Sequence, residues 1–191
     1  MVSAFGDQTF LLFALMAFVF PLSMGMVVAA APVFGAEMGL GEGYIGLVLG
    51  GNSLIVAALA IPAATRMEAM GPFRLLGGAA ALVSAALFSY ALIPDVASAL
   101  LVGTVVFSFG EIVFSSAVPA AVAGLAPAGR RGAYQGGWAL VASFSMGSAL
   151  ALSGWLKGGV GWQGAWLAYA TVALAAAVAL AASARGGFLR Q

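Results

Sequence analysis

Charged residues are so sparse along the chain that they divide it into long uncharged stretches. These stretches cover residues 8–36, 43–65, 75–94, 96–110, 112–129, 132–156 and 158–184. A helix that spans a bilayer needs roughly 20 apolar residues, and five of the seven stretches reach that length alone. The other two, 96–110 and 112–129, are too short, and only Glu111 separates them, with no turn sequence beside it. We therefore join them into one helix that carries a carboxylate.

The joined pattern predicts six membrane-spanning helices, near 10–34, 43–64, 73–93, 97–123, 133–156 and 161–183. A membrane β-barrel would alternate apolar and polar residues, whereas the run 172–182 is apolar throughout. The helices fill the chain, so we expect residues 1–191 to form a single all-α domain, a six-helix integral membrane bundle. Pro21 and Pro119 fall inside the first and fourth helices, where each removes a backbone hydrogen bond and favours a kink.

The composition narrows the classes of protein further. Charged residues make up 7% of the 191 and hydrophobic residues 63%, and the mean hydropathy is +1.11. A soluble domain carries about 25% charged residues, so the chain is not a soluble enzyme or a disordered protein. A net charge of +1 gives no bulk attraction to nucleic acid. The chain has no Cys and no His, which excludes disulfides, thiolate metal sites and imidazole bases. We expect no catalytic residue, metal or cofactor.

The basic residues predict the orientation in the membrane, because short loops rich in Lys and Arg stay in the cytoplasm. Six predicted cytoplasmic positions carry arginine, namely Arg66, Arg74, Arg130, Arg131, Arg185 and Arg190. The opposite side holds one basic residue, Lys157, with Glu37, Glu42 and Asp95. Aromatic residues near the predicted outer ends, among them Tyr44, Tyr90 and Trp162, fit an interfacial belt. We expect a multi-pass protein of the cell membrane with both termini cytoplasmic.

Glu111 is the strongest candidate for chemistry, because a charge inside a membrane helix costs about 2.5 kcal/mol or more. At helical spacing Thr104, Ser108, Glu111 and Ser115 share one face. One interpretation is a protonatable cavity residue that couples proton movement to transport. The other is a neutral acid hydrogen-bonded to a neighbouring helix, which holds the bundle together. Asn52 should lie at a similar depth, either as a site residue that bonds substrate or shares the proton, or as a contact between helices.

The fifth predicted helix has two faces of interest. Small residues align along one of them, namely Gly132, Gly136, Ser143, Gly147 and Gly154, and such a face lets another helix approach closely. The second face carries Trp138, Ser145 and Ser148. That face would line a pathway, although hydroxyls in membrane helices commonly bond their own backbone.

Two stretches of sequence resemble a known family. The run 39–46, Gly-Leu-Gly-Glu-Gly-Tyr-Ile-Gly, resembles the entry into the second helix of each half of major facilitator transporters. Gly110-Glu111, Pro119, Ala126-Pro127 and the run 131–136, Arg-Gly-Ala-Tyr-Gln-Gly, resemble the fourth and fifth helices of the second half in efflux-type members. The loop from Pro62 to Arg74 departs from the family pattern, since it lacks the usual Asp.

The resemblance covers essentially the whole chain as one six-helix half of a twelve-helix transporter. It implies that helices 1, 2, 4 and 5 face a central cavity, and that the arginines at 66, 74, 130 and 131 contribute to a cytoplasmic gate. The implied function is secondary transport of a small solute, as proton-coupled efflux of an apolar or cationic compound. The implied partners are the lipid bilayer, a small-molecule substrate and a second six-helix half, which is a separate chain, a second copy or a missing N-terminal half.

Two alternatives remain open at this point. The chain could be a non-transporting six-helix membrane subunit or assembly factor, in which Glu111 is structural and the polar stripe binds a partner helix. A channel fits less well, because the sequence has no filter-like loop between its helices.

Overall fold

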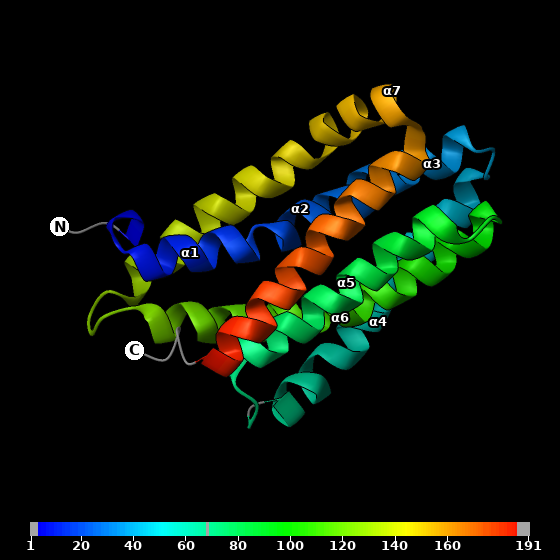
Figure 1. The fold of residues 1–191 in the computed structure, drawn as a ribbon. Helices are drawn as coiled ribbons and strands as arrows, with labels where there is room; N and C mark the ends of the chain where they lie inside the picture. The colour runs from blue at the N-terminus through cyan, green and yellow to red at the C-terminus, as the bar shows by residue number, and fades with distance from the viewer. Residues whose placement is uncertain (1–3, 68, 187–191) are drawn as a thin grey trace.

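The computed structural model describes residues 4–67 and 69–186, with the backbone alone at 185 and 186, and these residues form helices and no strand. After a short turn, η1 (Ala4–Gly6), the chain enters an N-terminal span, Gln8–Glu37. The long helices α4 (Glu42–Met67), α5 (Pro72–Leu92), α6 (Val96–Leu125) and α7 (Arg131–Gly186) follow. They lie roughly lengthwise beside one another, as Figure 1 shows. Arg190 and Glu68, like the side chain of Arg185, lie outside the described residues.

Five helical stretches of the described chain are long and apolar enough to cross a membrane. The two short uncharged stretches of the sequence are both parts of α6, which passes Glu111 and Pro119 as one helix of 30 residues. α6 stays helical through Pro119 and ends at Leu125, and the kink expected at Pro119 stays a prediction.

The N-terminal span is the irregular one. It consists of α1 (Gln8–Ala17), α2 (Val19–Gly25), the π-helical stretch η2 (Met26–Ala30) and α3 (Ala31–Glu37). The first interruption, at Phe18, lies just before Pro21, which has no N–H to bond the carbonyl of Ala17. The π stretch directly precedes Pro32, another missing donor. Each irregularity therefore lies beside a proline, and at the first one Ser145 of α7 also donates to the Phe18 carbonyl.

α7 is divided by Gly161, whose φ of 70° and ψ of 178° lie outside the helical region. The sequence predicted helices at 133–156 and 161–183 with a loop between them, whereas the chain stays helical up to this single glycine. Figure 1 shows the chain reversing direction there. The hydroxyl of Tyr169 in the second arm (162–186) lies 3.4 Å from the carbonyl oxygen of Ala149 in the first arm (131–160).

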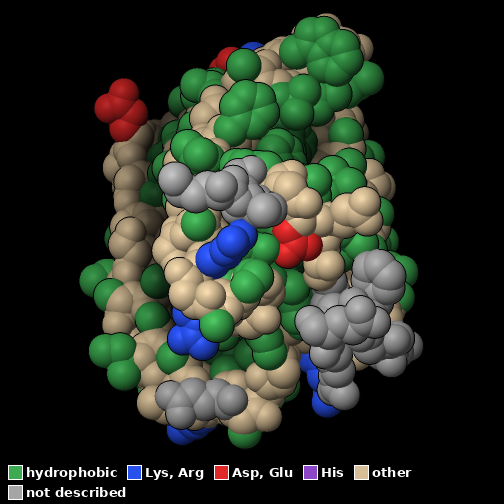
Figure 2. Space-filling view, turned by 90° about the vertical axis from the view of Figure 1, so that its left-hand side faces the viewer, with side chains coloured by type: hydrophobic (Ala, Val, Ile, Leu, Met, Phe, Trp, Pro, Cys, Tyr) green, Lys and Arg blue, Asp and Glu red, His purple; other side chains and the backbone are tan. Residues whose placement is uncertain are grey.

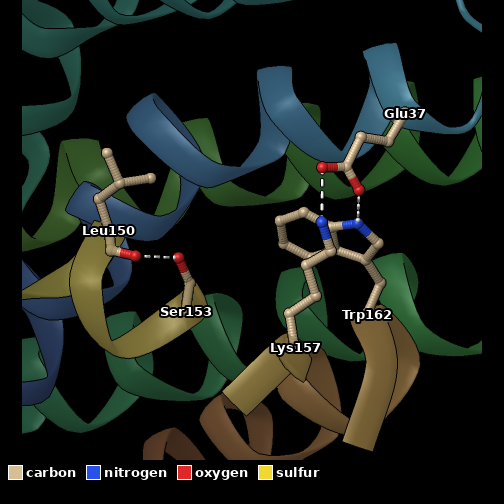
Figure 3. Close-up of polar contacts among 5 residues, drawn as sticks. All are labelled: Glu37, Leu150, Ser153, Lys157 and Trp162. Carbon is tan, nitrogen blue, oxygen red and sulfur yellow. Dashed lines mark hydrogen bonds and ion pairs between the residues drawn. The ribbon is translucent and has the colours of Figure 1, made fainter. Parts of the chain in front are cut away.

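Glu37 fastens both arms at this reversal, as Figure 3 shows. Its Oε1 is 2.5 Å from Nζ of Lys157, and its Oε2 accepts a hydrogen bond of 2.8 Å from Nε1 of Trp162. The Lys157 ammonium also lies 5.1 Å from the centre of the Trp162 ring. Because the ion pair is exposed, water screens its attraction and it adds little to stability. The contact matters for the geometry of the turn, because one carboxylate binds a residue before Gly161 and a residue after it.

α5 is the central helix of the bundle, because it packs along α6 on one side and along the second arm of α7 on the other. Glycines allow the closest approaches. A Cβ built on Gly110 of α6 would lie 3.3 Å from the carbonyl oxygen of Ala79. The N-terminal span packs on the first arm of α7, where a Cβ on Gly25 would lie 2.5 Å from both the Cβ of Ala149 and the carbonyl oxygen of Met146.

The described chain begins and ends at the same end of the bundle in Figure 1, and the turns that lead into α5 and α7 lie at that end too. Figure 2 looks onto this end and shows several basic side chains there. The arginines described at this end are Arg66, Arg74, Arg130 and Arg131. Lys157 and three acidic residues, Glu37, Glu42 and Asp95, lie at the ends of helices on the opposite side.

Asp7 joins the start of the N-terminal span to the start of α7. Its Oδ1 accepts from the backbone N–H groups of Thr9 and Phe10, and its Oδ2 accepts from the Tyr134 hydroxyl at 2.6 Å. The Tyr134 hydrogen bond is the main cause that lowers the pKa of the Asp7 carboxyl from its ordinary value, and the backbone bonds lower it further. Asp7 is thus both a helix cap and a link between helices.

The tight contact at Gly25 predicts that even a methyl group added there lowers the stability of the fold. Gly25→Ala should lower the free energy of unfolding by about 1–3 kcal/mol, because neither the Ala149 Cβ nor the Met146 carbonyl can move aside freely. Gly51→Ala is the matched control, since Gly51 lies inside α4 with nothing within 4 Å of a Cβ. Unfolding in mixed detergent micelles, followed by tryptophan fluorescence, measures both. Equal stability of the two variants would contradict the packing described.

The Asp7 link predicts a pH dependence of stability. The pKa of Asp7 is lowered in the folded state, so its contribution is complete above the unfolded value of about 3.9 and is lost as pH falls through the lower folded value. Tyr134→Phe should destabilise the chain by about 1 kcal/mol at pH 7, and the difference from the parent should shrink as pH falls through the lowered pKa of Asp7. Detergent unfolding curves between pH 7 and pH 3 measure this. A difference that persists at low pH would show that the hydroxyl acts through packing alone.

Candidate functional site

Glu111 lies in the middle of α6, half-buried, on the side that faces α4. Its Oε2 accepts a hydrogen bond of 3.2 Å from Nδ2 of Asn52 in α4. Within the described residues Glu111 has no ion pair, so the amide of Asn52 is its polar partner. A carboxyl group inside a membrane helix without a cation favours its neutral form, because burying a charge is costly.

α4 and α6 run in the same direction, and a tyrosine sets their register. Both helices begin at the end of the bundle where the N-terminal span finishes. The Tyr44 hydroxyl donates to the Ala97 carbonyl at 2.8 Å near that end. About two turns further along α4, Asn52 reaches Ser108 and Glu111, which are one turn apart on α6. The approximate depth of Asn52 was predicted from the sequence, and the Tyr44 contact determines which residues of α6 it meets.

Ser108 continues the polar contacts of Asn52 into the core. Its hydroxyl lies 2.6 Å from Oδ1 of Asn52 and 2.9 Å from the Thr104 carbonyl oxygen, so it can donate to either. The Thr104 hydroxyl lies 2.9 Å from the hydroxyl of Tyr90, and the Tyr90 ring stacks on Trp166 at 4.6 Å between centroids. The structure therefore brings together four of the expected polar residues, Asn52, Thr104, Ser108 and Glu111, and connects them to α5 and α7.

Tyr90 and Trp166 are residues of this network that sequence reasoning missed. Tyr90 fitted an interfacial belt because it lies near the end of a predicted helix, but its side chain is only 3% exposed. It occupies space beside Gly103, where a Cβ would lie 2.8 Å from the ring. A glycine one residue before Thr104 was the available signal, since it permits a ring to approach the α6 backbone. The interfacial role expected for Tyr90 is replaced by burial inside the bundle.

Ser115 does not join this network. It lies one turn beyond Glu111, is exposed, and its hydroxyl donates to the Ile112 carbonyl of its own helix at 3.1 Å. On the second face of the fifth predicted helix, one serine likewise bonds its own helix while another bonds a neighbouring helix. Ser148 bonds its own helix at the Phe144 carbonyl, whereas Ser145 is buried and donates to the Phe18 carbonyl at 2.7 Å. Trp138 is buried too, 5.6 Å from the Phe13 ring.

The small-residue face of the first arm of α7 has no neighbour within this chain. All of its residues are exposed, namely Gly132, Gly136, Ser143, Gly147 and Gly154. A Cβ added at any of the four glycines would meet nothing within 4 Å. The close contact with the N-terminal span uses the other side of the arm, through Gly137 and Ala149. Close packing of the small-residue face by another helix stays a prediction about a partner.

The chemistry available at the site is that of one carboxyl group, one amide and hydroxyls. The described residues contain no group of three or more acidic, His or Cys side chains that could hold a metal ion. The arginines 66, 74, 130 and 131 lie at the end of the bundle, away from Glu111 by the length of a half-helix. The site can thus bind or release a proton and form hydrogen bonds within the thickness of a membrane.

Comparison with known proteins identifies the family. The family model described as Major Facilitator Superfamily matches residues 13–186, nearly the whole chain. No curated protein matches the chain, and no solved structure matches it. Members of this family are membrane transporters rather than enzymes. A match of this extent, with the apolar helices described above, shows that the chain is a multi-pass membrane protein that belongs to the Major Facilitator Superfamily.

Proposed function

We propose that this chain is one half of a twelve-helix secondary transporter that couples efflux of a small apolar or cationic solute to proton movement across the cell membrane. The observation that carries the proposal is Glu111, a carboxyl group in mid-helix whose described partner is the neutral amide of Asn52. Intramembrane carboxyl groups without a cation are characteristic of proton pathways. Glu111 holds its proton at rest and releases it when water or substrate reaches the site.

Six crossings with both termini in the cytoplasm fit the geometry best. The 54 residues of α7 from Arg131 to Ala184 would extend about 80 Å as one helix, far more than the roughly 30 Å of a bilayer core. Division at Gly161 yields two arms of spanning length. With α4, α5, α6 and the N-terminal span, this makes six, and the described arginines then face the cytoplasm as the positive-inside rule requires.

A second six-helix half is the partner that we infer. α4 has little cover from the rest of the chain, and Leu47, Leu54 and Ile61 on its open side are each more than 70% exposed. The first arm of α7 leaves its small-residue face open. The two halves of this family are related by an axis along the membrane normal, and each half supplies one wall of the cavity. The second half is a separate chain, a second copy or another part of a longer protein.

The surface around the N-terminal span suggests the kind of solute. A groove of about 390 Å³ lies between α1 and the first arm of α7, and apolar side chains line it, including Leu11, Leu15, Leu140 and Phe144. With one carboxyl group in the half-site and its arginines at the end, this wall favours an apolar or cationic compound over an anion.

The association of the two halves gives one test. Gly147→Leu should leave this chain folded, because nothing in it lies within 4 Å, but should abolish association with the second half by blocking close backbone approach. Gly78→Leu in α5 is the matched control, since Gly78 is also exposed with nothing nearby. Pull-down between differently tagged copies, and with a co-expressed six-helix partner chain, measures association. If Gly147→Leu associates as the parent does, that face contacts lipid.

The role of Glu111 gives the second test. In proteoliposomes that contain the complete transporter, Glu111→Gln should remove the pH dependence of uptake of a cationic fluorescent dye, because glutamine keeps the hydrogen bonds and cannot ionise. Glu42→Gln is the control, an exposed carboxylate at the start of the same α4 that carries Asn52. Unchanged pH dependence in Glu111→Gln would make the residue structural. Absence of transport by every assembled form would favour the non-transporting subunit instead.

A further inference from the structure

The side-chain amide of Asn52 bridges two groups of α6 with its two different ends. Its Nδ2 donates to Oε2 of Glu111 at 3.2 Å, and its Oδ1 accepts from the Ser108 hydroxyl at 2.6 Å. The nitrogen end of an amide can only donate and the oxygen end can only accept. The two ends have almost the same size and shape, so the amide can turn over within the same space.

The arrangement seen in the structure satisfies an ionised Glu111. A carboxylate has no proton and can only accept, so Asn52 must present its NH₂ group to it. The Asn52 oxygen then faces Ser108, whose hydroxyl supplies the donor. Hydrogen bonds to an ionised acceptor are about twice as strong as neutral ones, so in this state α4 is held firmly to α6.

A protonated Glu111 favours the opposite arrangement. Its carbonyl oxygen can still accept from Nδ2, but its O–H needs an acceptor, and the NH₂ group of Asn52 offers none. Turning the amide over puts Oδ1 against the Glu111 proton and Nδ2 against the Ser108 oxygen. The Ser108 proton then goes to the Thr104 carbonyl, which already lies 2.9 Å away. Each of these three contacts again pairs a donor with an acceptor, so both arrangements can form without moving a helix.

No other charged group of the described chain stands close to Asn52, Ser108 and Glu111. The helices packed on α6 carry their charged residues at their ends, namely Glu42 and Arg66 on α4, Arg74 on α5, Glu37 on α3, and Arg131 and Lys157 on α7. The tyrosines within these helices have partners elsewhere: Tyr44 bonds Ala97, Tyr90 bonds Thr104, Tyr134 bonds Asp7 and Tyr169 bonds Ala149. The charge state of Glu111 is thus the variable to which Asn52 responds.

We propose that Asn52 is a positioning residue whose amide turns over each time Glu111 gains or loses its proton, and that this reverses the Ser108 hydrogen bond and changes how strongly α4 is held to α6. Of the hydrogen bonds described between α4 and α6, the one formed by Tyr44 is independent of Glu111 and the two formed by Asn52 depend on it. The inference rests on the proposed function only in that Glu111 exchanges its proton during transport.

The sequence provides an unusually selective probe, because Asn52 is the only asparagine among the 191 residues. The full chain in detergent, labelled with ¹³C and ¹⁵N asparagine alone, gives one side-chain NH₂ signal and one side-chain carbonyl signal by NMR. Both signals should change together over one pH interval, and both should stop responding to pH in Glu111→Gln. Ser53→Ala, at the exposed neighbouring position of α4, should leave the response as in the parent.

Ser108→Ala separates turnover from a simple change of charge nearby. If the amide turns over, this variant shifts the Asn52 carbonyl signal at high pH, where Ser108 bonds the oxygen, and the NH₂ signal at low pH, where Ser108 bonds the nitrogen. If the variant shifts the carbonyl signal alone at both pH values, the amide stays in one orientation and the proposal is wrong. Should Glu111→Gln fail to fold, this pair of spectra still decides.

The same measurements distinguish this inference from the proposed function. If the Asn52 signals report amide turnover but dye transport shows no pH dependence, the turnover is supported and proton coupling is refuted. Asn52 signals that ignore pH, in a transporter whose pH dependence is lost in Glu111→Gln, would refute the turnover and leave the coupling role intact.

Discussion

The hydrocarbon interior of a bilayer offers no hydrogen-bond partners, and the polar side chains of this protein are placed accordingly. Ser84 of α5 donates to the Ala170 carbonyl of α7, and Ser145 of α7 donates to the Phe18 carbonyl at the proline-interrupted part of the N-terminal span. Each joins helices far apart in the sequence. Because an unsatisfied polar group in hydrocarbon costs several kcal/mol, the few polar residues of the sequence become the fixed points of the bundle. Among the described residues the Trp166 Nε1 is an exception, with no partner although the ring is buried.

Apolar packing follows a different rule, since helices in lipid gain little from hiding hydrophobic surface and instead gain from close contact. Gly25 against Ala149, and Gly110 against Ala79, bring backbones together in the part of the bundle around α5 and the N-terminal span. α4 has no such contact, because none of its glycines 43, 46, 50 and 51 has a neighbour within 4 Å of a Cβ. Its attachment to α6 therefore depends more on Tyr44 and Asn52 than on packing.

Local patterns in the sequence predict much of this architecture, and long-range contacts account for what they miss. The length of an uncharged stretch depends only on neighbouring residues. The ranges of α4, α5 and α6 could therefore be predicted to within a few residues, with Glu111 inside one helix. The side of a helix that packs depends on the shape opposite it. Gly147 and Gly137 are equally small, and Ala4 and Phe10, far away in the sequence, make Gly137 the one in contact. Tyr90 was misplaced for the same reason, because the gap at Gly103 that accepts its ring belongs to another helix.

The position of the site follows from these two kinds of packing. From Glu37, Lys157 and Trp162 at the reversal of α7, aromatic contacts lead through Trp166 to Tyr90. Hydrogen bonds then lead through Thr104 and Ser108 to Asn52 and Glu111. All of this lies on closely packed helices except Asn52, which belongs to α4. A proton on Glu111 therefore acts at the boundary between the well-packed part of the bundle and its least covered helix. At that boundary a change in one hydrogen bond is a large fraction of what holds the two sides together, whereas in the core around α5 the same change would be opposed by many backbone contacts.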